Sequence, residues 1–214
     1  MAITFNPNPM TEVEAVNNML LSIGKAPVNT LAVSGINDVS WATTTLYSVC
    51  RDVQHTKYWF NRETCFPISA TAGAGGTLNI LIPAGVLDIC PSDRTLPLNE
   101  RNGMLYDSEK HTFDLTPRLQ ANVLNVDLVW CFPFEQLPHS ARMYIAARAG
   151  RQFQATAIGS QIIYQFTKEM ELEAEAELKR SELRNSGTNM FTAPTRNGRI
   201  YNRQPAAGHN NGFW

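Results

Sequence analysis

Residues 12–31 read EVEAVNNMLLSIGKAPVNTL, and they contain the first helix that the sequence predicts. Thr11 and Glu14 match a capping box, in which the hydroxyl accepts from the Glu14 amide and the carboxylate reaches back to the Thr11 amide. Apolar residues then recur at helical spacing, and Gly24 supplies a stop signal. The stretch therefore predicts a capped amphipathic helix, followed by a connector that contains Pro27.

A second helix is predicted to begin at Asn37 or Asp38, since either side chain can cap a helix. Its apolar stripe consists of Val39, Ala42, Leu46, Val49 and Val53. The helix is expected to end within residues 57–63, KYWFNRE. A stripe of this kind is typical of an ordinary core. Two helices cannot cover each other completely, so later segments must complete that core.

From Phe66 to about Phe134 the pattern changes to short β-rich segments separated by Gly, Pro, Asn and Asp. These segments are TLNILIP, VLDIC, GMLYD, HTFDL and NVDLVW. Alternation of apolar and polar residues is clearest in residues 123–130, and Asn102-Gly103 is a strong hairpin-turn signal. We therefore predict a small antiparallel β domain inserted into a helical protein.

Helical patterns return after Pro138, which suits the start of a helix. Gly159 interrupts the pattern, and residues 161–185 then form the longest predicted helix. Its expected apolar face consists of Ile163, Phe166, Met170, Ala174 and Leu178. Glutamates crowd its middle, while basic residues lie near its end, where they complement the helix dipole. Glu175 and Lys179 form a favourable i,i+4 pair.

Together these patterns predict an α+β fold: a bundle of four main α-helices with an inserted small antiparallel β domain and an extended C-terminal tail. The expected divisions are a first part of the helical domain at residues 1–65, the inserted β domain at 66–135, a second part of the helical domain at 136–185, and the tail at 186–214.

The C-terminal tail has a distinctive composition. The last thirty residues contain three arginines and no Asp or Glu, so the segment is locally basic. A segment so rich in Asn, Gly, Thr and Pro is not expected to fold alone. Its aromatic residues, which include a terminal Phe213-Trp214, favour ordering on another subunit. A plain disordered terminus is the alternative.

Overall composition excludes several classes of protein. A formal net charge of -1 argues against a globally basic nucleic-acid binder and a strongly acidic chain. The cysteines Cys50, Cys65, Cys90 and Cys131 form no C-x-x-C pair, so we expect reduced, mostly buried thiols in a protein made in a reducing cytoplasm. The N-terminus lacks a signal-peptide pattern, and no apolar run approaches the roughly 20 residues that span a bilayer. We therefore expect a soluble protein without membrane association.

No catalytic, metal-binding or cofactor-binding residue is predicted. The sequence lacks a nucleophile elbow, a P-loop, an H-E-x-x-H motif and an EF-hand loop. The glycine cluster at residues 72–76 precedes a predicted strand, so it indicates a turn and not a phosphate loop. The four histidines, His55, His111, His139 and His209, are scattered. Paired acids could hydrolyse glycosides, but nothing singles out a pair among Asp88, Asp93, Asp107, Asp114 and Asp127.

Three motifs match one family. The string A-V-N-x-x-L-x-S-I-G-x-x-P-V-x-T-L is carried by Ala15, Val16, Asn17, Leu20, Ser22, Ile23, Gly24, Pro27, Val28, Thr30 and Leu31. Residues 103–115 contain a G-x-x-Y-D turn, and residues 137–160 an L-P…Y-I…A-x-R-x-F helix. In these motifs the chain resembles tail tubular protein A, the head-to-tail adaptor of short-tailed podovirus bacteriophages. The resemblance spans roughly residues 12–185 and leaves both ends of the chain uncovered.

The resemblance implies a structural virion protein and not an enzyme. It implies a homo-oligomeric ring, typically a dodecamer, docked beneath the portal protein, with a tail nozzle protein like tail tubular protein B below and tail fibres nearby. Genomic DNA would pass through the ring during ejection without specific binding. Such a subunit is made in the host cytoplasm and resides at the head–tail junction of the virion tail.

On this interpretation the tail inserts between portal subunits. The candidate portal-docking residues are Phe191, Arg196, Arg199, Tyr201, Arg203, Phe213 and Trp214. Two alternatives stay open. One is a tail-associated cell-wall hydrolase with its active site in the β domain, and the other is a different head–tail connector protein with similar helices.

Overall fold

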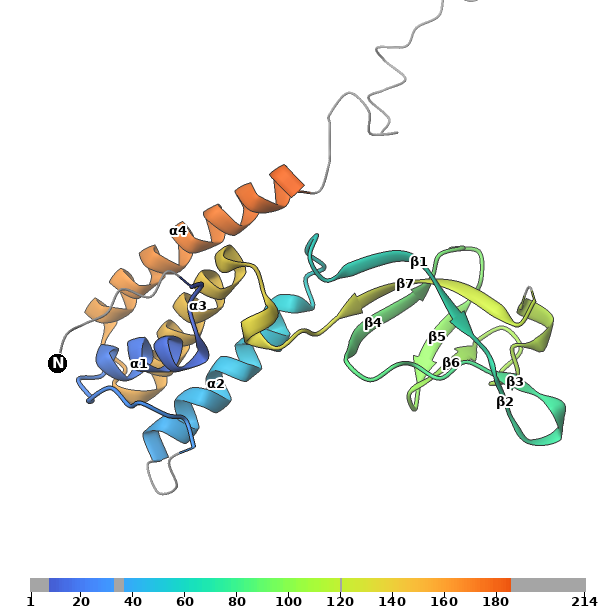
Figure 1. Cartoon of the computed structure of the whole chain (residues 1–214), viewed down its shortest axis with the longest axis horizontal. Helices are drawn as coiled ribbons and strands as arrows, with labels where there is room; N and C mark the ends of the chain where they lie inside the picture. The colour runs from blue at the N-terminus through green and yellow to red at the C-terminus, as the bar shows by residue number, and fades with distance from the viewer. Residues whose placement is uncertain (1–7, 33–36, 120, 186–214) are drawn as a thin grey trace, which may run out of the picture.

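The structure is a computed structural model that describes residues 8–32, 37–119 and 121–185. In this part of the chain it has four α-helices and small antiparallel sheets, so the predicted α+β class is confirmed. The helices gather at one end of Figure 1 and the strands at the other. The helices are α1 (Glu12–Ser22), α2 (Asn37–Gln54), α3 (His139–Ala157) and α4 (Gln161–Asn185).

The predicted capping box of α1 is confirmed. The Thr11 amide donates to Glu14 Oε2 at 2.8 Å, and the Glu14 amide donates to Thr11 Oγ1 at 3.3 Å. The chain leaves the helix at Gly24, whose φ of +74° lies in the left-handed region that glycine tolerates best. The Asn17 amide then holds the connector by bonding both the N–H and the carbonyl of Val28.

The predicted stripe of α2 is buried at all five positions, which are Val39, Ala42, Leu46, Val49 and Val53. The helix ends at Gln54, so the prediction that it continues into residues 57–63 was wrong. Asn61 Nδ2 donates to the Gln54 carbonyl at 2.6 Å and satisfies a group that a further helical turn would have used. Lys57 has a φ of +69°, and strand β1 begins at Arg62.

Helix α3 packs against the other three helices. Its buried residues, Ala141, Tyr144, Ile145, Ala149 and Phe153, join those of α1 and α2 in one apolar cluster. The Phe153 ring meets the Trp41 ring edge-on, with 5.0 Å between centroids. Helix α4 contributes the fully buried Leu178 to this cluster.

The largest sheet has three antiparallel strands in the order β1-β7-β4, with β7 in the centre. Two short hairpins, β2-β3 and β5-β6, complete the strand region. The bounds are β1 Arg62–Ser69, β2 Thr71–Ala72, β3 Leu78–Asn79, β4 Val86–Pro91, β5 Leu98–Arg101, β6 Met104–Asp107 and β7 Val123–Trp130. The predicted Asn102-Gly103 turn joins β5 to β6, with φ values of 53° and 70°.

Two features of the strand region differ from the sequence prediction. Strands β1 and β5 were not predicted, because most of their side chains are exposed and they lack a clear apolar alternation. Conversely, the segment HTFDL at residues 111–115 is not a strand, and Thr112 forms only an isolated bridge with Asp107. Side chains in this segment bind backbone amides and turn the chain, as described below.

The strands enclose an apolar cluster of their own, distinct from that of the helices. Its buried residues are Ile68, Ile80, Ile89, Leu98, Leu105, Leu115, Leu124, Val126 and Leu128. Two chain segments join the helices to the strands, one leaving α2 and one returning from β7 (Figure 1). Asn61 bridges them, since its Nδ2 donates to the Trp130 carbonyl while its own carbonyl accepts from the Trp130 amide.

None of the four cysteines is paired in a disulfide. Cys50 is buried, Cys90 and Cys131 are half-buried, and Cys65 is exposed. The expectation of mostly buried thiols was therefore wrong. Cys65 lies where the register of β1 shifts against β7, and this bulge turns its side chain towards solvent.

Candidate subunit interface

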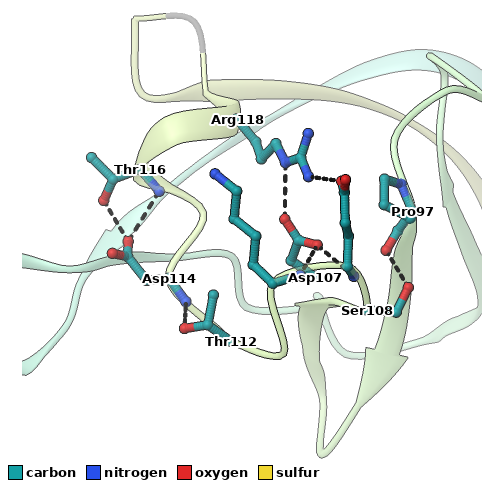
Figure 2. Close-up of polar contacts among 9 residues, drawn as sticks. Pro97, Asp107, Ser108, Thr112, Asp114, Thr116 and Arg118 are labelled. Atoms are coloured by element: carbon teal, nitrogen blue, oxygen red, sulfur yellow. Dashed lines mark hydrogen bonds and ion pairs between the residues drawn. The ribbon is translucent and has the colours of Figure 1, made fainter.

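Asp107, at the end of β6, is enclosed and fully bonded. One carboxylate oxygen accepts from the backbone amides of Glu109 and Lys110 at 2.9 and 3.0 Å, and the other accepts from Arg118 Nε at 2.9 Å (Figure 2). Burial alone would raise the pKa of Asp107, but these hydrogen bonds and the Arg118 charge outweigh it and lower the pKa. Asp107 is therefore an ionised structural group that closes the turn after β6.

Asp114 has a similar role one turn later. Its Oδ1 accepts from the Thr116 hydroxyl and amide and from the Leu78 amide, which ties residues 111–118 to β3. The hydrogen bond from the Thr116 hydroxyl is the main reason that the pKa of Asp114 is lowered. Figure 2 shows that the two carboxylates have different partners, since Asp114 bonds Thr116 and Asp107 bonds Arg118. A general acid needs a raised pKa, so neither carboxylate fits that role.

The other aspartates of the strand region also have structural partners. Asp127 Oδ1 accepts from the Ser92 hydroxyl at 2.7 Å, which is the main reason that the pKa of Asp127 is lowered, and its Oδ2 pairs with Arg94. Asp93 accepts from the Thr95 hydroxyl and amide. Asp88 pairs with Lys57 across the junction with the helices. Because these aspartates are all engaged in structural contacts, their arrangement does not favour the alternative of a cell-wall hydrolase.

The three histidines in the described part of the chain do not converge on a site. His55 and His111 are exposed, His139 begins α3, and His209 lies outside the described residues. Within the described ranges, no group of three His, Cys, Asp or Glu side chains could hold a metal ion. None of the helices in this part of the chain is long and apolar enough to cross a bilayer.

Helix α4 exposes large apolar side chains that the fold of a single chain does not bury. Ala174, Leu178 and Ile163 of the predicted apolar face are buried or half-buried, but Phe166 and Met170 are 64% and 63% exposed, so only part of that face is buried. The five residues do not form one straight stripe: at about 100° per residue, Phe166 and Met170 turn away from the side that carries Leu178. Large exposed apolar side chains of this kind mark contact surfaces.

A groove of about 680 Å³ runs along this side of α4. It lies between α3 and α4, with Met143 and Ala147 on one wall and Met170 and Glu173 on the other. Trp59, from the junction with the strands, lines it as well. A second hollow of about 370 Å³ shares Met143 and Met170 and extends the apolar surface towards Leu21 of α1. The concave surface is therefore mainly apolar and lies on the helices.

Charged residues lie both at the groove and on the opposite side of α4. Glu177 accepts from Arg180 Nη1 at 3.0 Å and from Arg184 Nη2 at 2.8 Å. On the opposite side of α4, the predicted pair of Lys179 with Glu175 is confirmed. Glu182 accepts from the Trp59 amide at 2.8 Å and attaches the end of α4 to the junction. These contacts fix the helix that presents the groove.

The predicted portal-docking residues of the tail cannot be placed beside this surface. All seven, Phe191, Arg196, Arg199, Tyr201, Arg203, Phe213 and Trp214, lie outside the described residues. Met143, Leu21, Leu172 and Leu183 are exposed apolar residues that were not singled out from the sequence. Helical spacing alone would have placed Leu172 and Leu183 on one side of α4, because they are eleven residues apart.

Comparison with protein families identifies the family of this chain. The family model of tail tubular proteins matches residues 13–188, which include every helix and strand described above except the first residue of α1. The chain belongs to the tail tubular protein family. A comparison with curated proteins found no match.

Membership in the tail tubular protein family makes this a structural protein of the phage tail, located in the virion. It also implies assembly with other subunits of the tail. The predicted resemblance to a phage tail tubular protein is thus confirmed. The exposed apolar groove on α3 and α4 is the surface on which we centre the candidate subunit interface.

Proposed function

We propose that this tail tubular protein is an adaptor, a ring subunit that connects the portal to the tail nozzle and forms part of the DNA conduit. The family match over residues 13–188 carries the proposal. In it, twelve copies form a homo-oligomeric ring at the head–tail junction. Portal lies on one side and a nozzle protein on the other, with tail fibres nearby. DNA passes through during ejection without specific binding, and the subunit is made in the host cytoplasm.

The electrostatic balance of the chain supports a conduit. A formal net charge of -1 leaves no large excess of positive charge to hold the DNA backbone. The ion pairs on α4 are internal, so Glu177 and Lys179 already have partners within the helix. A wall of this composition allows DNA to slide past.

The proposed organisation places an inserted β domain within a bundle of four helices, followed by an extended tail. The separate apolar clusters of the helices and of the strands support it. The β domain was predicted at residues 66–135. We place its start at residue 62, because β1 extends from Arg62 to Ser69 across the predicted boundary. The domain then contacts one neighbouring component of the tail while the helices close the ring.

The adaptor role is tested by mixing the purified protein with the portal of the same phage and imaging the product by electron microscopy. We expect a ring beneath the portal. If the mixture contains only free portal and free subunit, the adaptor role is wrong.

The portal-docking role of residues 186–214 needs a separate test. The deletion variant is expected to stay folded and to bind portal poorly, because it lacks the arginines and aromatics named above. A second variant changes Arg196, Arg199 and Arg203 to Ala and leaves the aromatics in place. If both variants join the portal as well as the full chain, the docking contacts lie elsewhere.

A further inference from the structure

Helix α4 presents three parallel rows of side chains. The row that packs on α3 contains Thr167, Glu171, Ala174 and Leu178. One position earlier runs a row that we call the leading flank: Phe166, Met170, Glu173 and Glu177. One position later runs the trailing flank: Lys168, Leu172, Glu175, Lys179 and Leu183. Because consecutive residues are about 100° apart around the axis, the two flanks lie on opposite sides of the packed row.

Both flanks expose large apolar side chains. Phe166 and Met170 are exposed on the leading flank, while Leu172 and Leu183 are 53% and 70% exposed on the trailing flank. Folding of a single chain does not require either pair to face solvent. A two-fold dimer would cover one self-complementary patch, whereas a closed ring needs two different patches on every subunit. One helix here carries two different patches.

The two flanks also match in shape. Beside the leading flank lies the groove between α3 and α4, which runs from Met170 to Asn185, a helix length of about 22 Å. The trailing flank is a ridge, and Leu172 and Leu183 are about 16 Å apart along it. A ridge of that length fits within the groove.

The apolar residues of the two flanks meet in a parallel arrangement. When α4 runs along the ring axis, copies related by rotation lie at the same height, so each residue of one leading flank faces residues of the next trailing flank that are one or two positions away in the sequence. This places Met170 beside Leu172 and Glu177 beside Lys179, and both charged side chains keep their partners within their own helix. Glu173 faces Glu175, a like-charged pair, but Lys179 already neutralises Glu175 within its own chain.

We infer that the trailing flank of α4 packs into the α3–α4 groove of the neighbouring copy, so that the α4 helices close the ring side by side in head-to-tail contacts. This inference rests on the ring proposed above and names the surfaces that form it. Each subunit uses one flank for each of its two neighbours.

A mixing experiment tests the head-to-tail contact. Met170→Asp damages the leading flank, and Leu172→Asp damages the trailing flank; both positions are exposed, so the fold is expected to survive, with circular dichroism as the check. By native mass spectrometry, we expect rings from the unmodified chain and monomers from either variant alone. An equimolar mixture should give a heterodimer, because one intact leading flank meets one intact trailing flank. Where the unmodified chain forms rings by itself, a mixture that stays monomeric, or a variant that still forms rings, overturns the inference.

Leu81→Asp is the matched control, since Leu81 is 51% exposed in the strand region, away from α4. This variant should assemble like the unmodified chain. If Leu81→Asp also lost its rings, a charge at an unrelated exposed position would be enough to block assembly. The assignment of the two α4 flanks to the ring contact would then be wrong.

Crosslinking in the portal complex tests this inference separately from the adaptor role. It also applies if the chain forms rings only when portal is present. Met170→Cys and Leu172→Cys are combined in a Cys65→Ser background and treated with a short bis-maleimide. We expect a ladder of covalent oligomers from the double variant and none from either single variant. A ring on portal without the ladder refutes the α4 contact and leaves the adaptor role standing. Absence of any ring refutes the adaptor role itself.

Discussion

The side-chain amide of Gln54 pairs with the backbone of Phe132 in the manner of a β-ladder. Gln54 Nε2 donates to the Phe132 carbonyl at 2.9 Å, and the Phe132 amide donates to Gln54 Oε1 at 2.8 Å. Gln54 is the last residue of α2, and Phe132 lies on the segment that returns from the strands. The pair therefore links the two chain segments that join the helices to the strands. Gln54 is fully buried at this point.

Replacing Gln54 with Leu keeps a side chain of similar volume but removes both hydrogen bonds. The amide and carbonyl of Phe132 lose these partners in a half-buried position, at a cost of about 1–3 kcal/mol each. We therefore expect Gln54→Leu to lower the free energy of unfolding by about 2–4 kcal/mol, as measured by urea denaturation. Gln136→Leu, at an exposed position, is the control and should change it by less than about 0.5 kcal/mol. Equal effects of the two changes would contradict the role given to Gln54.

Asp107 makes stability dependent on acid pH. Hydrogen bonds from the backbone and Arg118 lower its pKa in the folded state, despite burial. The unfolded chain therefore takes up this proton first, and the contribution of Asp107 is present above about pH 4, the ordinary value for an aspartate. It is lost as pH falls through the lower pKa of the folded state. Asp107→Asn, which cannot ionise, should be less stable than the unmodified chain at pH 7, with a difference that narrows below about pH 4.

The measurement is the melting temperature of both proteins across pH 3–7, by differential scanning calorimetry. Asp52→Asn, at an exposed position on α2, is the control and should follow the unmodified chain. If the difference in melting temperature between Asp107→Asn and the unmodified protein stays constant down to pH 3, the charge of Asp107 does not cause the difference in stability.

Local signals in the sequence were enough to predict several elements. The capping box at Thr11 and Glu14 and the turn at Asn102-Gly103 depend only on neighbouring residues, and both form as expected. Strand β1 was missed because it is held by pairing with β7, more than fifty residues away along the chain. The segment at residues 111–115 was assigned to a strand, although Asp114 bonds Thr116 and Leu78 and turns the chain.

The candidate interface shows a further limit of sequence reasoning. Spacings of three and four residues made Phe166 and Met170 look continuous with Leu178, and the exposure of the first two became clear only in the packed structure. An apolar residue at helical spacing can face a core or a second subunit, and one chain does not distinguish the two. The tail residues stay a prediction from composition, since they lie outside the described residues.

Leu178 and Leu183 provide a matched pair on α4 for separating the core from the surface. Leu178 is fully buried and Leu183 is largely exposed. Leu178→Ala should lower the free energy of unfolding of the monomer by about 2–5 kcal/mol, because it leaves a cavity among α3 and α4. Leu183→Ala should lower it by less than about 0.5 kcal/mol. Both values are measured by urea denaturation at a concentration where the protein is monomeric. Similar losses from the two changes would contradict the packing of α4 described here.

The cysteines are expected to react with alkylating agents in an order set by exposure. Burial is the main reason that the pKa of the Cys50 thiol is raised to about 11, so almost none of it is thiolate at pH 8. Its side chain is also enclosed in the helical core, which blocks the reagent. Cys65 is exposed on the bulge of β1.

We therefore expect iodoacetamide at pH 8 to label Cys65 first and Cys50 only after unfolding in urea, as measured by peptide mass spectrometry over time. The Cys65→Ser variant is the control, since it should lose the fast phase alone. Labelling of Cys50 as fast as Cys65 in the folded protein would show that α2 does not bury its thiol.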